Sequence, residues 1–398
     1  MFRVLDRLLR PAKIALIGGS WTVNVAEQLT KSSFSGEVIA VNPKRDTLGQ
    51  FDCVKSVEDL PFVPDAAFIG VNRELTVLMV AKLNKLGAGG AVCFASGFKE
   101  SDLEGAEDLQ SALVEAAADM PILGPNCYGL INYLDNVTLW PDQHGGTAVE
   151  RGVAILGQSS NVAINMTMQR RGLPLAYLVA LGNQAHTDVS DLIVHMARDP
   201  RVSAIGMHLE GIADLKRFCA AIAIAHECNK PVVVLKVGKS LKSQLAAQSH
   251  TASLCGAASA ATALFKRLGI VEVDDIEVFL ETLKLLHFYD YQVGDALCSV
   301  SCSGGEAGLM ADAVSQTELR LPDFSESASR SLGSILGQKV SIANPLDYHT
   351  YIWGDIDTMT ATFSEVMSDS FDLVVFVLDI PHRERCDAQG HDCADLNY

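Results

Sequence analysis

Two kinds of segment alternate regularly along this sequence, and the alternation limits the folds that it can adopt. Short apolar runs at residues 14–17, 38–41, 67–71 and 92–95 each end in a loop with Gly, Asn or Ser, and a longer segment of helical periodicity follows. Short buried strands that alternate with helices are typical of βαβ units with a parallel sheet. The pattern predicts an α/β fold that begins with a doubly wound domain.

The same alternation continues along the rest of the chain. A second series begins at 153–156, includes the β-branched run 232–235 and ends near residue 286, and a third begins at 297–301. A chain of 398 residues is too long for one ordinary core. We therefore predict three α/β domains and a tail, at residues 1–145, 150–288, 292–380 and 381–398.

Composition excludes several classes of protein. The net charge is −17, which disfavours binding to a nucleic acid backbone. No apolar run approaches the length of about 20 residues that spans a bilayer, and arginines interrupt the first ten residues, unlike the apolar core of a secretory signal. The ten cysteines lie mostly in apolar runs, where free Cys behaves as a small hydrophobe. We expect a reducing, cytoplasmic setting without membrane or nucleic acid partners.

Three predicted strand–loop–helix junctions have the composition of anion-binding loops. Small residues follow each strand, so backbone N–H groups and a helix N-terminus would face an anion such as phosphate. An ordinary solvated loop has the same composition, and that alternative stays open for each junction. The three loops are Gly18-Gly19-Ser20, Gly157-Gln158-Ser159 and Ser303-Gly304-Gly305.

The loop after the second predicted strand is basic. Asn42-Pro43 is followed by Lys44 and Arg45, where an NAD-binding domain would have an acidic residue for the ribose hydroxyls. Basic groups favour a ribose that carries a phosphate, as in NADP and coenzyme A. The first domain is therefore expected to bind one of these two cofactors.

His250 is the strongest candidate for a catalytic residue. It lies among small hydroxyl and alanine residues in Gln248-Ser249-His250-Thr251-Ala252-Ser253, without a Cys or second His at ligand spacing. This setting suits a nucleophile that accepts a phosphoryl group better than a metal ligand, although a solvated histidine has the same setting. Glu210 ends an apolar strand, where a carboxylate could orient the imidazole or simply face solvent.

Other polar residues are assigned minor roles. Lys236 and Lys239 are expected in a solvated basic loop close to His250 in sequence. We predict no metal site, because the His and Cys residues of the polar tail fit no paired ligand spacing. Those residues are His382, Cys386, His391 and Cys393.

Several motifs together resemble a known family, the NDP-forming (ADP-forming) acyl-CoA synthetases. The chain is similar over roughly residues 1–380 to their CoA-binding and ligase-like portion, which is related to the succinyl-CoA synthetase alpha subunit. The resemblance implies a Rossmann-like CoA-binding domain followed by two flavodoxin-like, succinyl-CoA synthetase-like domains. The motifs that carry it are 13–20, Asn42-Pro43, Ser96-Gly97-Phe98, 123–129, 157–160, Leu181-Gly182-Asn183, Leu209-Glu210-Gly211 and Ser249-His250-Thr251.

The resemblance implies a reversible acid–thiol ligase. An acid, CoA and ATP give acyl-CoA, ADP and phosphate through an acyl phosphate and a phosphohistidine. His250 matches the phosphorylated position, Glu210 matches the acid that supports it, and Trp140, His144 and Asn183 are candidates for the acyl pocket. The remaining matches are Gly18, Gly19, Ser20, Pro43, Lys44, Ser96, Gly97 and Asn126 for the CoA site, and Gly157, Gln158, Ser159, Ser303, Gly304 and Gly305 for the phosphate loops.

The sequence departs from the family in two places. The usual Ser-His-Thr-Gly is Ser-His-Thr-Ala, and we expect activity to survive Ala252. Nothing that resembles the ATP-grasp domain, which would bind ATP and Mg²⁺, follows the motif Asn344-Pro345-Leu346-Asp347. The resemblance therefore implies an ATP-grasp partner subunit or a fused domain, and an assembly with a partner or with itself.

Two other functions remain open at this point. One is a CoA- or acyl-CoA-sensing module, as in protein acetyltransferases, which the retained His250 argues against. The other is an NADP-dependent oxidoreductase, which accounts for Lys44 and Arg45 but leaves the second and third domains without a task.

Overall fold

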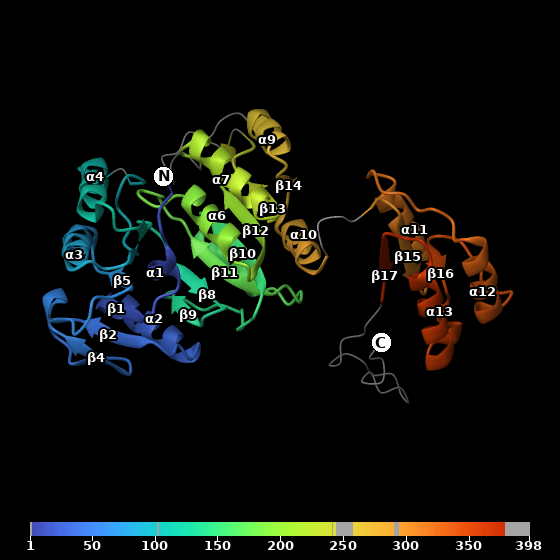
Figure 1. Cartoon of the computed structure of the whole chain (residues 1–398), viewed down its shortest axis with the longest axis horizontal. Helices are drawn as coiled ribbons and strands as arrows, with labels where there is room; N and C mark the ends of the chain where they lie inside the picture. Colours follow the sequence, from blue (N-terminus) through green and yellow to red (C-terminus); the bar gives the residue numbers. More distant parts are fainter. Residues whose placement is uncertain (1, 102, 241, 244–257, 290–293, 379–398) are drawn as a thin grey trace. The chain divides into compact units, whose positions relative to one another are not determined.

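The structure of the chain is a computed structural model that describes residues 2–101, 103–240, 242–243, 258–289 and 294–378. The chain divides into two compact units, Met1–Tyr289 and Asp290–Tyr398. The first unit contains two sheets and the second contains a smaller one (Figure 1). Each sheet has parallel strands flanked by helices, so the predicted α/β fold class is confirmed.

The first sheet has the strand order β3-β4-β2-β1-β5-β6-β7, parallel except for the β3–β4 pair. Its strands are β1 (Lys13–Gly18), β2 (Glu37–Val41), β3 (Thr47–Leu48), β4 (Phe51–Val54), β5 (Ala66–Gly70), β6 (Ala91–Cys93) and β7 (Ile122–Leu123). The accompanying helices are α1 (Asp6–Leu9), α2 (Ser20–Lys31), η1 (Val57–Asp59), α3 (Arg73–Leu86) and α4 (Ala106–Ala117).

The two faces of this sheet belong to different cores. Side chains alternate along a strand, so Ile14 and Leu16 of β1 face one core while Ala15 and Ile17 face the other. The second core lies under α3 and α4. The first extends through α2, which packs against β9, into the second sheet (Figure 1). The two sheets of this unit therefore share one continuous apolar interior.

The second sheet has the order β14-β13-β12-β10-β11-β8-β9. Its strands are β8 (Leu130–Asn132), β9 (Val137–Leu139), β10 (Gly152–Gly157), β11 (Leu175–Ala180), β12 (Val202–Leu209), β13 (Val232–Lys236) and β14 (Val271–Val273). The accompanying helices are α5 (Ser160–Thr167), α6 (Val189–Arg198), α7 (Leu215–Glu227), α9 (Ala258–Arg267) and α10 (Ile276–Phe288).

The hairpin of β8 and β9 links the first two predicted domains. The predicted division assigns these residues to the first domain, which would end at residue 145. In the structure the hairpin pairs antiparallel with β11 and so extends the second sheet. A pairing between distant strands leaves no local signal in the sequence, which is why the alternation pattern did not reveal it.

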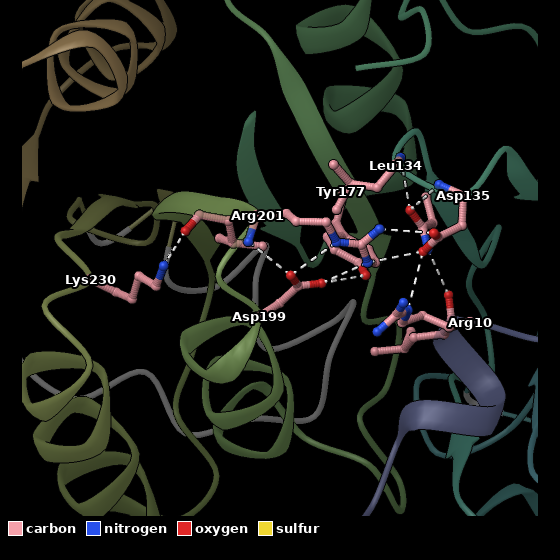
Figure 2. Close-up of polar contacts among 10 residues, drawn as sticks. Arg10, Leu134, Asp135, Tyr177, Asp199, Arg201 and Lys230 are labelled. Carbon is pink, nitrogen blue, oxygen red and sulfur yellow. Dashed lines mark hydrogen bonds and ion pairs between the residues drawn. The ribbon is translucent and has the colours of Figure 1, made fainter. Parts of the chain in front are cut away.

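An ion-pair network around Arg201 lies at the amino-terminal ends of the parallel strands of the second sheet (Figure 2). The guanidinium donates to Asp135 at 2.8 and 3.1 Å and to Asp199 at 3.1 and 2.9 Å. Tyr177 Oη donates to Asp199 at 3.1 Å, and Arg10 Nε lies 3.3 Å from Asp135. Burial raises the pKa of the Asp199 carboxyl, but hydrogen bonds from Arg201 outweigh it and lower the pKa.

The second unit has a parallel sheet in the order β16-β15-β17. Its strands are β15 (Leu297–Ser301), β16 (Leu346–Asp347) and β17 (Leu373–Phe376). The helical segments are α11 (Gly304–Val314), α12 (Glu326–Leu336), η2 (Thr350–Ile352) and α13 (Ile356–Ser368). Buried side chains such as Val300, Leu332 and Leu346 form its core. Throughout the described part of the chain, none of the helices combines the length and apolar character that crossing a membrane requires.

Candidate functional site

A cavity of about 500 Å³ lies where loops from the two sheets of the first unit meet. We call it the junction cavity. Parallel sheets bind ligands at the carboxyl ends of their strands, and the loops around this cavity follow β6, β7, β10, β11 and β12. Six site candidates from the sequence line it together: Ser96, Asn126, Gln158, Ser159, Asn183 and Glu210.

The loop after β10 begins α5 and supports the neighbouring strand end. Ser159 caps the helix, its Oγ accepting the Val162 N–H at 3.4 Å. The buried Gln158 amide oxygen accepts the N–H groups of Glu210 and of Gly211, the latter at 3.1 Å. Gln158 therefore fixes the backbone from which the Glu210 carboxylate reaches the junction cavity.

Lys236 also supports the Glu210 backbone, and this corrects one expectation. The sequence predicted a solvated lysine, but Lys236 ends β13, is 8% exposed, and donates through Nζ to the Glu210 carbonyl at 2.7 Å. A run of apolar residues before a lysine does not reveal that its amine turns back onto the backbone. Lys239 lies in ion pairs with Glu272 at 2.9 Å and Asp274 at 2.7 Å.

The loop of Gly124 to Cys127 crosses from the first sheet to the second. Asn126 has a positive φ of 59°, a conformation that Asn tolerates better than most residues. Its N–H donates to the Ala95 carbonyl at 2.9 Å, and the Asn183 N–H donates to the Pro125 carbonyl at 2.9 Å. Backbone bonds thus tie the loops after β6 and β11 to this crossing.

A second cavity, of about 410 Å³, lies at the carboxyl ends of β1 and β2. We call it the β1–β2 cavity. The candidate CoA-binding residues Gly18, Gly19, Pro43 and Lys44 line it. Ser20 is the first residue of α2, directly after this loop.

Gly18 is required by its surroundings. Its φ is +145°, and a Cβ there would lie 2.5 Å from the Gly70 carbonyl oxygen and from Thr22 Oγ1. Asn42 Nδ2 donates to the Gly18 carbonyl at 2.7 Å, and Asn42 Oδ1 accepts the Lys44 N–H at 2.9 Å. These bonds join the two strand ends and place Lys44 at the cavity.

Two further lysines, which sequence analysis did not single out, line the β1–β2 cavity. Lys55 pairs with Asp46 at 2.7 Å and Lys82 with Glu58 at 2.9 Å, and both carboxylates are largely exposed. Exposed ion pairs are weak, so these amines can turn toward a bound phosphate. Their positions far from Lys44 in sequence gave no signal before the fold was known.

Aromatic rings pack together at the wall of the junction cavity. Trp21, the second residue of α2, lies 5.1 Å from the Phe94 ring, and Phe94 lies 5.8 Å from Tyr128. Phe94 and Tyr128 line the junction cavity. The acyl-pocket candidates do not gather here: Asn183 lines the junction cavity, Trp140 is fully buried, and His144 lines a different cavity.

Several predicted site residues lie elsewhere in the chain. Gly97 is in the loop after β6, and its φ is +93°. Ser303, Gly304 and Gly305 belong to the second unit, where Ser303 Oγ caps α11 by accepting the Glu306 N–H at 3.4 Å. His250 and Ala252 lie outside the described residues.

Comparisons with known proteins point to one family. A sequence model of a CoA binding domain matches residues 12–133, and one of a succinyl-CoA ligase like flavodoxin domain matches residues 150–286. The ADP-forming acetate–CoA ligase I of Archaeoglobus fulgidus is 35% identical over 86% of this chain and 50% of its own length. The chain thus spans about half the length of this relative.

Two further relatives cover more of their own length. The alpha subunit of ADP-forming acetate–CoA ligase II from Pyrococcus furiosus is 28% identical over 95% of this chain and 83% of its own. The apo structure of dinucleotide forming acetyl-coenzyme A synthetase 1 from Ca. Korarchaeum cryptofilum superposes with a TM-score of 0.83. It is 26% identical and covers 94% of this chain and 83% of its own.

Proposed function

Because this chain belongs to the ADP-forming acyl-CoA synthetase family and spans its CoA-binding and ligase-like portion, we propose that it is a component of an acid–thiol ligase. The ligase forms acyl-CoA, ADP and phosphate reversibly from a carboxylic acid, CoA and ATP. The junction cavity carries this proposal, because a single cavity is lined by candidate CoA-binding residues of one sheet and candidate phosphate-binding residues of the other.

In the acyl-CoA-cleaving direction, phosphate attacks the thioester carbon and CoA leaves as the thiol. The resulting acyl phosphate passes its phosphoryl group to an imidazole nitrogen of His250, and the carboxylic acid is released. The Gly157-Gln158-Ser159 loop at the N-terminus of α5 holds the phosphoryl oxygens, since helix N-termini stabilise anions. Glu210 orients the His250 imidazole and stabilises its cationic form.

The β1–β2 cavity holds the nucleotide end of CoA. Gly18, Gly19 and Ser20 supply backbone donors, while Pro43 and Lys44 flank the ribose phosphate. Lys55 and Lys82 add positive charge around the same space. The loops of Ser96, Gly97 and Asn126 guide the thiol end toward the junction cavity.

The second half of the reaction needs groups beyond those described. An ATP-grasp subunit or domain binds ATP and Mg²⁺ and exchanges the phosphoryl group with His250. This fits a chain similar to proteins named alpha subunits. In the second unit, Ser303, Gly304 and Gly305 form a further candidate phosphate-binding loop at the N-terminus of α11. We propose a cytoplasmic, oligomeric enzyme with domains at 1–145, 150–288 and 292–380.

Radiolabelled phosphate tests this function. The full chain is incubated with it and with a panel of acyl-CoAs that includes acetyl-CoA, and protein-bound label is tested for stability in base and lability in acid. We expect label with at least one acyl-CoA and none in His250→Ala. CoA binding without label from any acyl-CoA would favour a sensing role, and binding of NADP instead of CoA would favour an oxidoreductase.

A further inference from the structure

The Glu100 carboxylate joins loops from both sheets beside the junction cavity. Its Oε1 accepts the N–H of Gly97 at 2.7 Å and that of Phe98 at 3.4 Å. Its Oε2 accepts the side-chain Nδ2 of Asn183. Glu100 follows β6 of the first sheet, whereas Asn183 follows β11 of the second. One carboxylate thus bridges the two halves of the cavity wall.

Asn183 is the other half of this bridge. Its Nδ2 also donates to Gln110 Oε1 at 3.0 Å, and its Oδ1 accepts the Asn126 Nδ2 at 3.4 Å. Asn183 and Asn126 both line the junction cavity, whereas Glu100 is not one of its lining residues. The position of both amides therefore depends on a carboxylate that does not itself line the cavity.

The chemistry of the bridge is specific to these residue types. A carboxylate only accepts hydrogen bonds, and all three groups that face Glu100 are donors. Charge-assisted bonds of this kind are stronger than neutral ones. The Gly97 carbonyl is held as well, by Arg73 Nη1 of α3 at 2.6 Å. The loop that contains Ser96 and Gly97 is thus fixed from both sides.

We propose that Glu100 is a positioning residue, which holds the loop of Ser96 and Gly97 against Asn183 and so sets the distance between the CoA thiol and the phosphate loop. This inference rests on the proposed function, because it assigns the two loops to CoA and to phosphate. Misplacing reacting groups by about 1 Å slows a reaction by roughly 100-fold, so a bridge of this kind controls rate more than binding.

An exchange of donor and acceptor tests the bridge. In Glu100→Gln the new amide opposes the Asn183 amide, and in Asn183→Asp two carboxylates face each other. In the double variant the amide introduced at position 100 donates to the carboxylate introduced at position 183, so the contact returns with its polarity reversed. The measurements are kcat and KM for acyl-CoA in phosphate labelling, and the Kd for CoA by calorimetry.

We expect each single variant to lower kcat roughly 10- to 100-fold. KM and the CoA Kd should both rise by about 3- to 10-fold. The double variant should return all three values to within about 3-fold of wild type. Glu104→Gln, at an exposed carboxylate of the same loop, is the matched control. Single variants that behave like wild type, or a double variant no better than the singles, would overturn the bridge.

Failure of the proposed function remains distinguishable. If wild type binds CoA but never labels, that function fails, and the Kd values alone decide on the bridge: it stands only if both single variants bind more weakly and the double variant recovers. If wild type neither labels nor binds CoA, both proposals are overturned. A fall in thermal stability with unchanged kcat and Kd would reduce Glu100 to a structural role.

Discussion

The polar groups at the two ends of the second sheet's strands differ in how far they are paired with other side chains. At the amino-terminal edge, Arg201 satisfies Asp135 and Asp199 with four hydrogen bonds (Figure 2). At the carboxyl edge, the Glu210 backbone is held firmly by Gln158 and Lys236, yet its side chain lines a cavity of about 500 Å³. We infer that the polar groups at the amino-terminal ends stabilise the fold, whereas those at the carboxyl ends form the candidate ligand site.

The largest effect on activity is expected from removing the Glu210 carboxylate at the carboxyl ends of the strands. Glu210→Gln should slow phosphate labelling roughly 100-fold, because groups that assist proton and phosphoryl transfer contribute about that much. The thermal midpoint should stay close to wild type. The rate of label appearance checks the first point and a melting curve the second, with Glu227→Gln, an exposed carboxylate on α7, as the control. A destabilised variant with normal labelling would reverse the comparison.

Removing the Arg201 guanidinium at the amino-terminal ends of the strands should lower stability and leave activity nearly unchanged. Arg201→Met leaves Asp199 with a side chain only 6% exposed and no guanidinium, which should lower the free energy of unfolding by about 2 kcal/mol. Labelling and CoA affinity should change little. Chemical denaturation measures the loss, and Arg198→Met, at an exposed position on α6, is the control.

The pH dependence of that loss follows from the network. Because the pKa of Asp199 is lowered in the folded state, its contribution is present above the unfolded pKa and is lost as pH falls through the folded one. The gap between wild type and Arg201→Met should therefore narrow below about pH 4. A gap that widens there would contradict the ion-pair account.

A backbone change at the first sheet tests whether its strand ends also serve ligands. Gly18→Ala puts a Cβ within 2.5 Å of the Gly70 carbonyl oxygen at a positive φ. We expect CoA affinity to fall roughly 10-fold, since forcing such a conformation costs about 1–2 kcal/mol or displaces the loop. Calorimetry with CoA measures it. Gly333→Ala in α12, where a Cβ meets nothing within 4 Å, should bind CoA normally.

The smallest expected effect concerns His208, which lies just before Glu210 on β12. Burial, together with the charge of Lys236, lowers its pKa to about 4. The unfolded imidazole titrates near pH 6.5, so the unfolded state binds more protons than the folded state between about pH 4 and pH 6.5. The free energy of unfolding therefore decreases as the pH is lowered through this range. From pH 7 to pH 6, wild type should lose roughly 0.7 kcal/mol more than His208→Gln. Chemical denaturation at the two pH values measures this difference. An equal change in the free energy of unfolding for both proteins would refute the buried neutral state of His208.

Much of the fold could be predicted because its signals are local. The apolar run at 153–156 falls within β10, and the loop after it begins a helix, as the alternation pattern requires. The β8–β9 hairpin could not be placed, because the residues of β11 that pair with β8 are 45 to 49 positions away and its sequence resembles any short strand. Pairing across that distance is decided by the shared core of the two sheets.

The site was predictable only where small residues follow a strand. That signal found Gly18 and Gln158, which line the two cavities. It missed Glu100, Lys55 and Lys82, because charged side chains in loops and on helix surfaces are usually solvated and nothing local distinguishes these three. The sequence also predicted a solvated Lys236, because the carbonyl that accepts its amine belongs to Glu210, which follows a different strand, β12.

The decisive experiment is to identify the residue that is phosphorylated. Wild-type chain labelled by acyl-CoA and phosphate is digested at neutral pH, and the phosphorylated peptide is sequenced by mass spectrometry. We expect one phosphoryl group on the imidazole of His250, with loss of labelling in His250→Ala. A phosphoryl group on any other residue, or undiminished labelling of that variant, would contradict it.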